Sequence, residues 1–454
     1  MADTIAALST PLAAGGIGVI RISGDDAITV ADKVVRTTSG KSLSSLKGYT
    51  AAHGRVVSDG DTVDECVALV FRAPKSYTGE NTVEISCHGG VFVCNQVLRA
   101  VLSCGARPAE AGEFTKRAFL NGKMDLSEAE AVMDLINAQG QSSMKAALTA
   151  LDGALSRKID ELCSVLLSAA AHMSAWVDYP DDDIPDLDFT VLRESLLSVH
   201  EQLSGLLSKF DAGKAITGGV DTAIVGKPNV GKSALMNMLS GFSRSIVTDI
   251  AGTTRDIVEE TVRVGSVLLR LSDTAGIRET GDVVESIGVE MARTKIERAG
   301  LILAVFDGSG DLEQSDKEIL ELCRDKNVIG IVNKTDLPKK ADIEYIKSVL
   351  GEIVFLSAKT HEGEKELTRA IEKVLGTDKI DTSQAMLATE RQRRSALLAL
   401  EAINEAIEGI DLGITMDAIN VCIDTAIEKL LELTGKKANE AVVDEVFSQF
   451  CVGK

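Results

Sequence analysis

The chain contains a short glycine- and lysine-bearing motif whose spacing is suited to binding phosphate groups. The motif GKPNVGKS occupies Gly226–Ser233 and fits the pattern G-x-x-x-x-G-K-[ST]. It directly follows the apolar Ala223–Val225, which predicts a strand, and a segment of helical spacing comes after it. The backbone amides of such a loop and the N-terminal end of a helix attract anions. The pattern therefore predicts that Lys232 reaches the β- and γ-phosphates and that the Ser233 hydroxyl binds Mg²⁺.

Three further motifs follow in the order that a guanine-nucleotide domain requires, each at the end of a strand-like apolar run. Asp273–Gly276 offers a carboxylate to the metal's water shell and a glycine amide to the γ-phosphate. In Asn333–Asp336, the aspartate can accept both N–H groups of a guanine edge, which adenine does not offer, and Ser357–Lys359 completes a base pocket. Together the four motifs predict GTP binding. The residues expected to contact GTP are Asn229, Val230, Gly231, Lys232, Ser233, Ala234, Thr248, Asp249, Ile250, Ala251, Gly252, Thr253, Thr254, Asp273, Thr274, Ala275, Gly276, Asn333, Lys334, Asp336, Ser357, Ala358 and Lys359.

The segment between the first two motifs carries the remaining hydrolysis chemistry. The small polar loop Thr248–Asp256 is suited to order around a nucleotide, and Thr254 is the expected second protein ligand to Mg²⁺. Ile277 occupies the position where Ras-type switches keep a glutamine that orients the attacking water. Hydrolysis must therefore use polar groups from a downstream carboxylate, a bound cation or a partner protein. Glu285 lies downstream, although its spacing alone favours a solvated helix-cap charge.

Beyond these motifs, essentially the whole chain resembles the MnmE family, also called TrmE, of tRNA-modification GTPases. Ordinary translational GTPases share the nucleotide motifs but not the other matching segments. The resemblance implies an N-terminal α/β domain similar to tetrahydrofolate-binding proteins, a helical domain, and a Ras-like phosphate-loop GTPase domain inserted into the helical one. The matching segments are Asp3–Ala7, Gly15–Gly24, Ser76–Glu80, His88–Gly90, Gly112–Thr115, Arg117–Leu126, Gly226–Ser233, Thr248–Asp256, Asp273–Glu279, Glu285–Gly288 and Phe450–Lys454.

The resemblance also implies a potassium site. Asn229 matches the family's potassium ligand, with Thr248, the backbone carbonyl of Ile250 and the nearby Thr253. Potassium there supplies positive charge where other GTPases place an arginine finger. Glu285 matches the glutamate that orients water, against the reading from spacing alone. The implied catalytic residues are Glu285, Lys232 and Asp273.

A second implied site binds a folate, as 5-formyl- or methylene-tetrahydrofolate, in the N-terminal domain, which in this family also forms a homodimer. Arg21, Glu84 and Lys123 match the pterin and glutamate-tail contacts, and Lys454 joins them from the far end of the chain. A carboxylate suits the donor edge of a pterin, and cations suit the folate carboxylates. From the pattern alone, Arg21 and Lys123 are expected to be surface charges.

The family's partner is the FAD-dependent protein MnmG, also called GidA, and the two act as one complex on tRNA. They install a carboxymethylaminomethyl or aminomethyl group on C5 of the wobble uridine, so the resemblance predicts a heterotetramer or larger assembly. The formal net charge of −20 disfavours broad RNA binding, and residues 1–122 hold equal numbers of acidic and basic side chains. A local basic patch or a more basic partner must then hold the RNA.

Composition and patterning place these sites in a multidomain chain. No apolar run reaches the ~18 residues of a membrane span, and the start lacks a secretory signal, which favours a cytoplasmic protein. The eight cysteines form no C-x-x-C pair, which disfavours zinc. Helical patterning is expected from Ser127 to about Phe210 with one break near Tyr179–Pro185, and again from near Met386. The expected domains are 1–122 for folate binding and dimerisation, 123–217 and 378–454 for the two helical halves, and 218–377 for the GTPase insertion.

Two other functions remain open from the sequence. An RNA-binding switch of the Era type, acting in ribosome assembly, would need a basic appendage and no folate. A folate-dependent aminomethyl transferase with merely regulatory GTP hydrolysis would act without the flavoprotein.

Within the phosphate loop, Lys227 is expected to face away from phosphate.

Overall fold

The computed structural model describes residues 3–178, 188–241, 260–272, 293 and 296–454. The chain divides into two compact units, one formed by Met1–Met133 with Ile427–Lys454 and the other by Asp134–Ala426. The domain boundaries expected from the sequence are finer than this division and stay a prediction. Among the helices in the described ranges, none has the length and hydropathy needed to cross a membrane.

The N-terminal unit is built on a seven-stranded sheet of order β3-β4-β5-β6-β2-β1-β7. Neighbouring strands are antiparallel except for β1 and β7, which are parallel. Its elements are β1 Ile5–Leu8, β2 Ile17–Ser23, α1 Ala27–Val34, β3 Val35–Thr37, η1 Leu43–Ser45, β4 Thr50–Ser58, β5 Asp61–Phe71, β6 Thr82–His88, α2 Val91–Ser103, β7 Arg107–Pro108 and α3 Glu113–Leu120.

Alternation along the strands gives this sheet two different faces. Ile20 and Ile22 of β2 point into a core that α1 and α2 also fill. Arg21 of β2 and Glu84 of β6 pair directly in the strand register and therefore lie on the opposite face. That second face carries a smaller apolar cluster, to which Phe114 of α3 belongs. The sheet thus positions two charged side chains beside an aromatic ring.

The end of the chain packs against the beginning within this unit. Helix α16, Glu440–Ser448, packs on α3, with the rings of Phe447 and Phe119 6.2 Å apart between centroids. Beyond α16, Val452 forms a β-bridge with Ala111, and the Phe114 amide donates to the Lys454 carbonyl at 3.2 Å. The C-terminal residues are therefore held on the N-terminal domain.

The helical segments contain more breaks than the sequence pattern predicts. The predicted single break between Ser127 and Phe210 is wrong, because further breaks occur at residues 138–140 and 152–153. Both contain glycine, and Gly153 adopts a left-handed φ of 77° that ends a helix readily. The last stretch begins at Glu390, not near Met386, because the Thr389 hydroxyl caps it by accepting from the Gln392 amide. The helices are α4 Leu126–Asn137, α5 Gln141–Leu151, α6 Ala154–Asp178, α7 Phe189–Ser208, α8 Phe210–Thr217, α14 Glu390–Leu412 and α15 Met416–Thr434.

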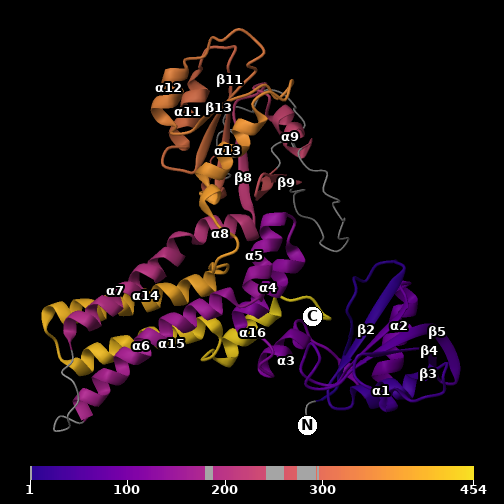
Figure 1. The fold of residues 1–454 in the computed structure, drawn as a ribbon. Coiled ribbons are helices and arrows are strands. Elements are labelled where there is room, and N and C mark those ends of the chain that lie inside the picture. The colour runs from indigo at the N-terminus through magenta and orange to yellow at the C-terminus, as the bar shows by residue number, and fades with distance from the viewer. Residues whose placement is uncertain (1–2, 179–187, 242–259, 273–292, 294–295) are drawn as a thin grey trace. The chain divides into compact units, whose positions relative to one another are not determined.

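Helix α7 packs against both α6 and α14, and the three run alongside one another (Figure 1). On α7 the buried Leu196, Val199 and Leu203 recur at intervals of three and four, which gives one apolar stripe. On α14 the buried Ala399 and Ile403 follow the same spacing. The amphipathic pattern seen in the sequence thus corresponds to helix packing.

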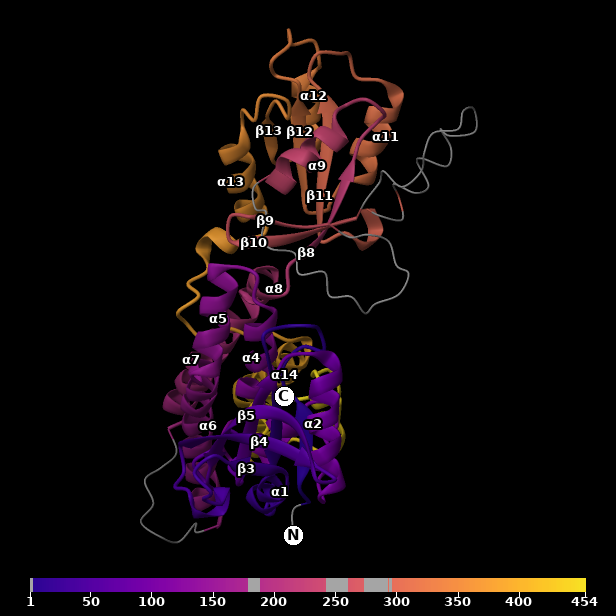
Figure 2. The ribbon, with the colours of Figure 1, turned by 90° about the vertical axis from the view of Figure 1, so that its right-hand side faces the viewer.

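The inserted domain is a six-stranded sheet of order β13-β12-β11-β8-β10-β9, parallel except for β9. One core lies between the sheet and α9 with α13, and a second between the sheet and α11 with α12. Figure 2 shows α13 and α11 on opposite sides of the strands. This arrangement confirms the predicted α/β domain. Its elements are β8 Val220–Val225, α9 Lys232–Gly241, β9 Glu260–Val264, β10 Val267–Ser272, β11 Leu301–Asp307, α11 Gln314–Leu322, β12 Val328–Asn333, α12 Ile343–Val349, β13 Ile353–Phe355, α13 Glu364–Val374 and η2 Thr377–Lys379.

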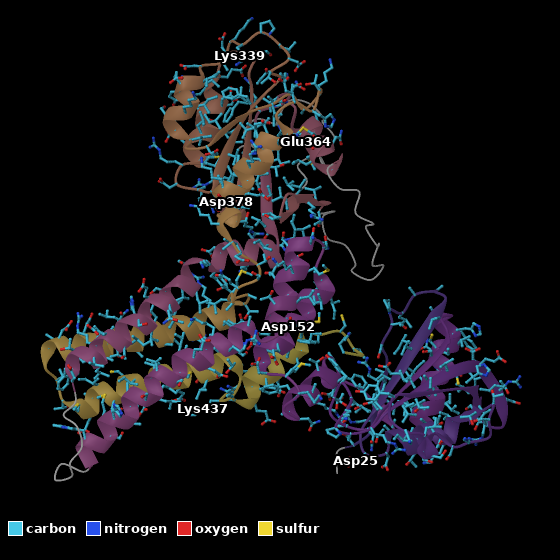
Figure 3. The ribbon with its side chains drawn as sticks, in the orientation of Figure 1. Asp25, Asp152, Lys339, Glu364, Asp378 and Lys437 are labelled. Carbon is cyan, nitrogen blue, oxygen red and sulfur yellow. The ribbon has the colours of Figure 1, made fainter. Side chains whose placement is uncertain are left out.

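The chain enters and leaves this domain at neighbouring points. It enters from α8 into β8 and leaves through η2, and α8 packs against η2. Asp378 in η2 and Lys339, beyond β12, mark opposite ends of the domain in Figure 3. Adjacent entry and exit points are what an insertion between two helical segments requires.

Candidate functional site

The phosphate loop has the strand-loop-helix context that its motif requires. Strand β8 ends at Val225 and α9 begins at Lys232. Gly226 has φ 153°, and a Cβ there would lie 2.4 Å from the Val305 carbonyl oxygen, so only glycine fits. Asn229 adopts a left-handed φ of 65°, and its side chain is exposed. The loop passes close over β11 and presents Asn229 to solvent.

Lys232 lies over the loop that it follows. Its Nζ donates to the carbonyls of Gly226 at 2.7 Å and Lys227 at 2.8 Å. Burial lowers the pKa of Lys232. Ser233 and Ala234 are exposed on the first turn of α9. The helix N-terminus and a desolvated ammonium together form a site for an anion.

Asn333 joins the phosphate loop to the base-binding motifs. Its Nδ2 donates to the Val230 carbonyl at 2.8 Å, while its Oδ1 accepts from the Ala358 amide at 3.0 Å. A Cβ on Gly231 would lie 2.2 Å from that Nδ2 atom, so Gly231 permits the close approach. Three separate motifs of the sequence are therefore connected through one buried amide.

The base-binding motifs are also held by their own side chains. Ser357 Oγ donates to Asp336 Oδ1 at 2.8 Å, which orients the carboxylate expected to read guanine. Lys334 adopts φ 65°, and its Nζ lies 2.6 Å from Asp307 Oδ2. Lys359 is exposed. These contacts place the predicted residues at the carboxyl ends of β12 and β13, where open α/β sheets bind ligands.

Part of the predicted nucleotide site lies outside the described residues. This applies to Thr248–Thr254, Asp273–Gly276 and the candidate water-orienting Glu285. Two ligands assigned to Mg²⁺ and potassium, Ser233 and Asn229, are within the described part, and the others are not. The assignments in these segments stay predictions.

The N-terminal unit brings the predicted folate residues Arg21 and Glu84 together. Arg21 donates to Glu84 Oε1 from Nε at 2.9 Å and from Nη2 at 2.7 Å. The side chain of Arg21 is only 14% exposed, so the expectation of a surface charge at this position is wrong. The guanidinium carbon lies 5.2 Å from the Tyr77 ring centroid and 5.6 Å from that of Phe114. A cation enclosed by two rings and a carboxylate is an ordered recognition element.

One donor in this cluster is left unsatisfied by the part of the chain that the structure describes. Arg21 Nη1 is buried and makes no hydrogen bond with any described residue. An unsatisfied buried donor costs free energy unless a ligand or water accepts from it. A ligand that places a hydrogen-bond acceptor beside Nη1 would therefore be stabilised at this site.

The other two predicted folate residues have different environments. Burial lowers the pKa of Lys454, the positive charge of Arg21 adds to the effect, and Glu84 opposes it. Lys454 is therefore within electrostatic reach of the pair. Lys123 is exposed, and its Nζ donates to the Pro74 carbonyl at 3.3 Å.

Sequence reasoning missed several supporting residues. Tyr77 and Phe114 lie inside segments already noted, but nothing in the pattern shows that they flank Arg21. Asp307 could have been noticed only as a carboxylate at the end of a predicted strand. Glu313 and Asp316, which pair with Lys227, were also missed.

Comparison with known families covers nearly the whole chain. Residues 126–451 match the family described as "MnmE helical domain", and residues 4–123 match "GTP-binding protein TrmE N-terminus". The first match begins at α4 and spans the inserted domain.

Curated relatives are similar over their full length. The chain is 44% identical over 459 residues to the tRNA modification GTPase MnmE of Geobacillus thermodenitrificans (strain NG80-2), with 100% of this chain and 99% of that protein covered. It is 42% identical to proteins of the same name from Acetivibrio thermocellus, with 100% and 99% covered, and from Bacillus subtilis (strain 168), with 100% of both covered.

Proposed function

Because the chain belongs to the MnmE family of tRNA modification GTPases, we propose that it is a potassium-dependent GTPase that helps to modify the wobble uridine of certain tRNAs. With the FAD-dependent protein MnmG, it would add a carboxymethylaminomethyl or aminomethyl group at C5. A tetrahydrofolate would carry the one-carbon unit. The observation that carries this proposal is the Arg21–Glu84 pair and its unpartnered nitrogen, in a chain that also has a complete set of GTPase motifs.

The loop geometry supports the assignment of the nucleotide and its cations. Lys232 and the first turn of α9 would hold the β- and γ-phosphates, with Mg²⁺ on Ser233 and Thr254. The exposed Asn229 carries an amide oxygen suited to potassium, together with Thr248, Ile250 and Thr253. Potassium would supply positive charge to the developing phosphate charge, and Glu285 would orient the water.

The arrangement around Arg21 supports the folate assignment. Glu84 would accept from the donor edge of a pterin, which is flat and suited to contact with Tyr77 or Phe114. Arg21 Nη1 would donate to an acceptor on the ligand. Lys454 and Lys123 would pair with folate carboxylates, which in turn would favour the protonated form of Lys454.

An apolar surface at one end of the N-terminal sheet supports the proposed homodimer. Ile17 begins β2 beside the end of β6, and its side chain is 67% exposed. Phe92 is the second residue of α2 and is 73% exposed, and Leu12, in the loop that precedes β2, is 64% exposed. Backbone hydrogen bonds between Gly15 or Gly16 and Gly89 hold these segments together. Exposed apolar side chains gathered in this way suit a second copy of the chain.

The net charge of the chain supports the proposal that it acts on tRNA together with a partner protein. A net charge of −20 opposes unaided binding of a polyanion, so a flavoprotein with basic surfaces would hold most of the tRNA. The chain would then contribute GTP hydrolysis and the folate.

Reconstitution tests the proposal. Unmodified tRNA is incubated with the purified chain, MnmG, GTP, KCl, methylene-tetrahydrofolate and an amine donor, either glycine or an ammonium salt, and the wobble nucleoside is identified by mass spectrometry. We expect the modified uridine only when all components are present. Modification without MnmG would favour the simple aminomethyl transferase, and folate-independent action on ribosomal RNA would favour an Era-type switch.

A further inference from the structure

The segment Asp307–Asp316, which joins β11 to α11, places carboxylates against two lysines of the nucleotide motifs. Lys227 of the phosphate loop lies with its Nζ 3.0 Å from Glu313 Oε1 and 3.0 Å from Asp316 Oδ2. Its ammonium thus points away from the phosphate position, as the sequence predicts. Its carbonyl accepts from Lys232 Nζ, so the backbone of Lys227 is part of the phosphate loop. Its side chain, by contrast, is bound to carboxylates at the start of α11.

In this group of Lys227, Glu313 and Asp316, the Asp316 carboxylate is held firmly in place. Asp316 is 1% exposed, and its Oδ2 also accepts from the Glu313 amide at 2.9 Å as the capping box of α11. Burial favours the neutral form of Lys227, but hydrogen bonds from its ammonium to Asp316 and Glu313 outweigh burial and raise its pKa. A charged lysine held by a rigid helix start restrains the loop that carries it.

The other end of the same segment restrains the base-binding motif. Asp307 Oδ2 pairs with Lys334 Nζ at 2.6 Å, and Asp307 Oδ1 accepts from the amide and hydroxyl of Ser309 at 2.9 and 2.6 Å. Burial disfavours the charged carboxylate, yet the bonds from Lys334 and Ser309 outweigh it and lower the pKa of Asp307. The Gly308 amide also donates to the Asn333 carbonyl at 2.9 Å. The segment Asp307–Asp316 thus contacts both the phosphate loop and the base-binding motif of the nucleotide site.

We propose that the segment Asp307–Asp316 positions the nucleotide site, holding the phosphate loop through Lys227 and the guanine-binding motif through Lys334. Lys227, Asp316 and Asp307 are positioning residues, because none of them is expected to touch the nucleotide. The inference rests on the proposed binding of GTP by Gly226–Ser233 and Asn333–Asp336. It adds that the two ends are restrained separately, by different carboxylates.

Separate restraint predicts two different losses of affinity. Releasing Lys227 disturbs the amides that face the phosphates, so the Lys227→Met variant loses about tenfold affinity for GDP and GTP but little for GMP. Releasing Lys334 disturbs the base pocket, so Asp307→Asn weakens GMP, GDP and GTP by a common factor, also about tenfold. Lys227→Arg keeps the charge and restores most of the GDP affinity.

Competition against a fluorescent GDP analogue, with GMP, GDP and GTP in turn, measures these factors on the full-length chain. Asp316→Asn, which keeps the shape of the side chain, is measured beside Lys227→Met. The matched control is Lys373→Met, which breaks the 2.6 Å pair with Glu352 between α13 and the start of β13. Melting curves of all variants check that the domain stays folded.

A fall in the GDP-to-GMP affinity ratio for Lys227→Met and Asp316→Asn, absent from Lys373→Met and reversed in Lys227→Arg, supports the proposal. Unchanged ratios in Lys227→Met and Asp316→Asn, or equal losses of all three nucleotides in these two variants, overturn it. Unchanged GMP affinity in Asp307→Asn overturns the restraint of the base-binding motif. Lys232→Ala separates the two proposals: if it still binds GTP normally, the nucleotide site itself is misassigned.

Discussion

Arg21 and Glu84 lie opposite each other on β2 and β6, and two nitrogens of the guanidinium share one carboxylate oxygen at 2.9 and 2.7 Å. The pair occupies the sheet face away from the main core, against Tyr77 and Phe114. Among the described residues, the Nη1 nitrogen of Arg21 has no acceptor, which supports the proposed ligand site beside the pair.

Replacing Arg21 by alanine is expected to weaken tetrahydrofolate binding by more than tenfold and to leave GTP binding unchanged. The substitution removes the unpartnered donor and leaves Glu84 without its cation. Equilibrium titration with each ligand measures both effects. Lys33→Ala, a change at an exposed lysine of α1 in the same unit, is the control. Unaltered folate affinity in Arg21→Ala would remove Arg21 from the site.

Gly453 is expected to be required for the position of Lys454. Its φ is 100°, and a Cβ there would lie 2.4 Å from the Leu8 carbonyl oxygen. Gly453→Ala should therefore displace the C-terminal residues and reduce folate affinity about tenfold. Gly40→Ala is the matched control, since Gly40 also has a positive φ, 70°, but open space around it. Equal affinities in the two variants would show that the tail does not build the site.

Glu285→Ala should bind GTP with normal affinity and hydrolyse it at least about a hundredfold more slowly. A residue that only orients water acts in the transition state and contributes little to ground-state binding. Single-turnover hydrolysis and nucleotide titration separate the two quantities. A hydrolysis rate equal to that of the unchanged chain would return Glu285 to a solvated surface charge.

The N-terminal unit is expected to lose stability in acid through Glu113. Burial would raise the pKa of Glu113, but hydrogen bonds from Arg107, the Glu110 amide and Arg117 outweigh burial and lower it. The folded protein therefore binds fewer protons than the unfolded chain below about pH 4.5, and stability falls as the pH falls through the lowered pKa.

Melting temperatures between about pH 3 and 6 measure this dependence. Glu113→Gln should be less stable above pH 4.5 and show a shallower decline below it. Glu65→Gln serves as control, because the Glu65 pair with Arg55 is exposed and such pairs contribute little. A decline as steep in Glu113→Gln as in the unchanged chain would assign the acid sensitivity to other carboxylates.

Local patterns predicted the elements that hold the nucleotide site. The strand before Gly226 and the strands before Asn333 and Ser357 all follow from apolar periodicity and turn residues, which act within a few positions. The additional helix breaks escaped prediction because the residues around Gly140 and Gly153 keep a helical apolar pattern on both sides.

Long-range contacts could not be read from the pattern. The burial of Arg21 depends on Tyr77 and Phe114, which come from separate loops and helices. The approach of Lys454 to the same site requires both ends of the chain to pack together, and only the family resemblance indicated it. Likewise, nothing in the spacing links Lys227 with Asp316, although each lies in a recognisable element.

The most direct test of the central claim is the rate of GTP hydrolysis by the purified chain in KCl and in NaCl at equal ionic strength, with Asn229→Ala measured beside it. We predict strong stimulation by K⁺ alone, lost in Asn229→Ala. We also expect the GTPase domains of two copies to meet transiently during hydrolysis, so the stimulated rate should fall on dilution. Equal rates in the two salts would contradict the proposed replacement of an arginine finger by potassium.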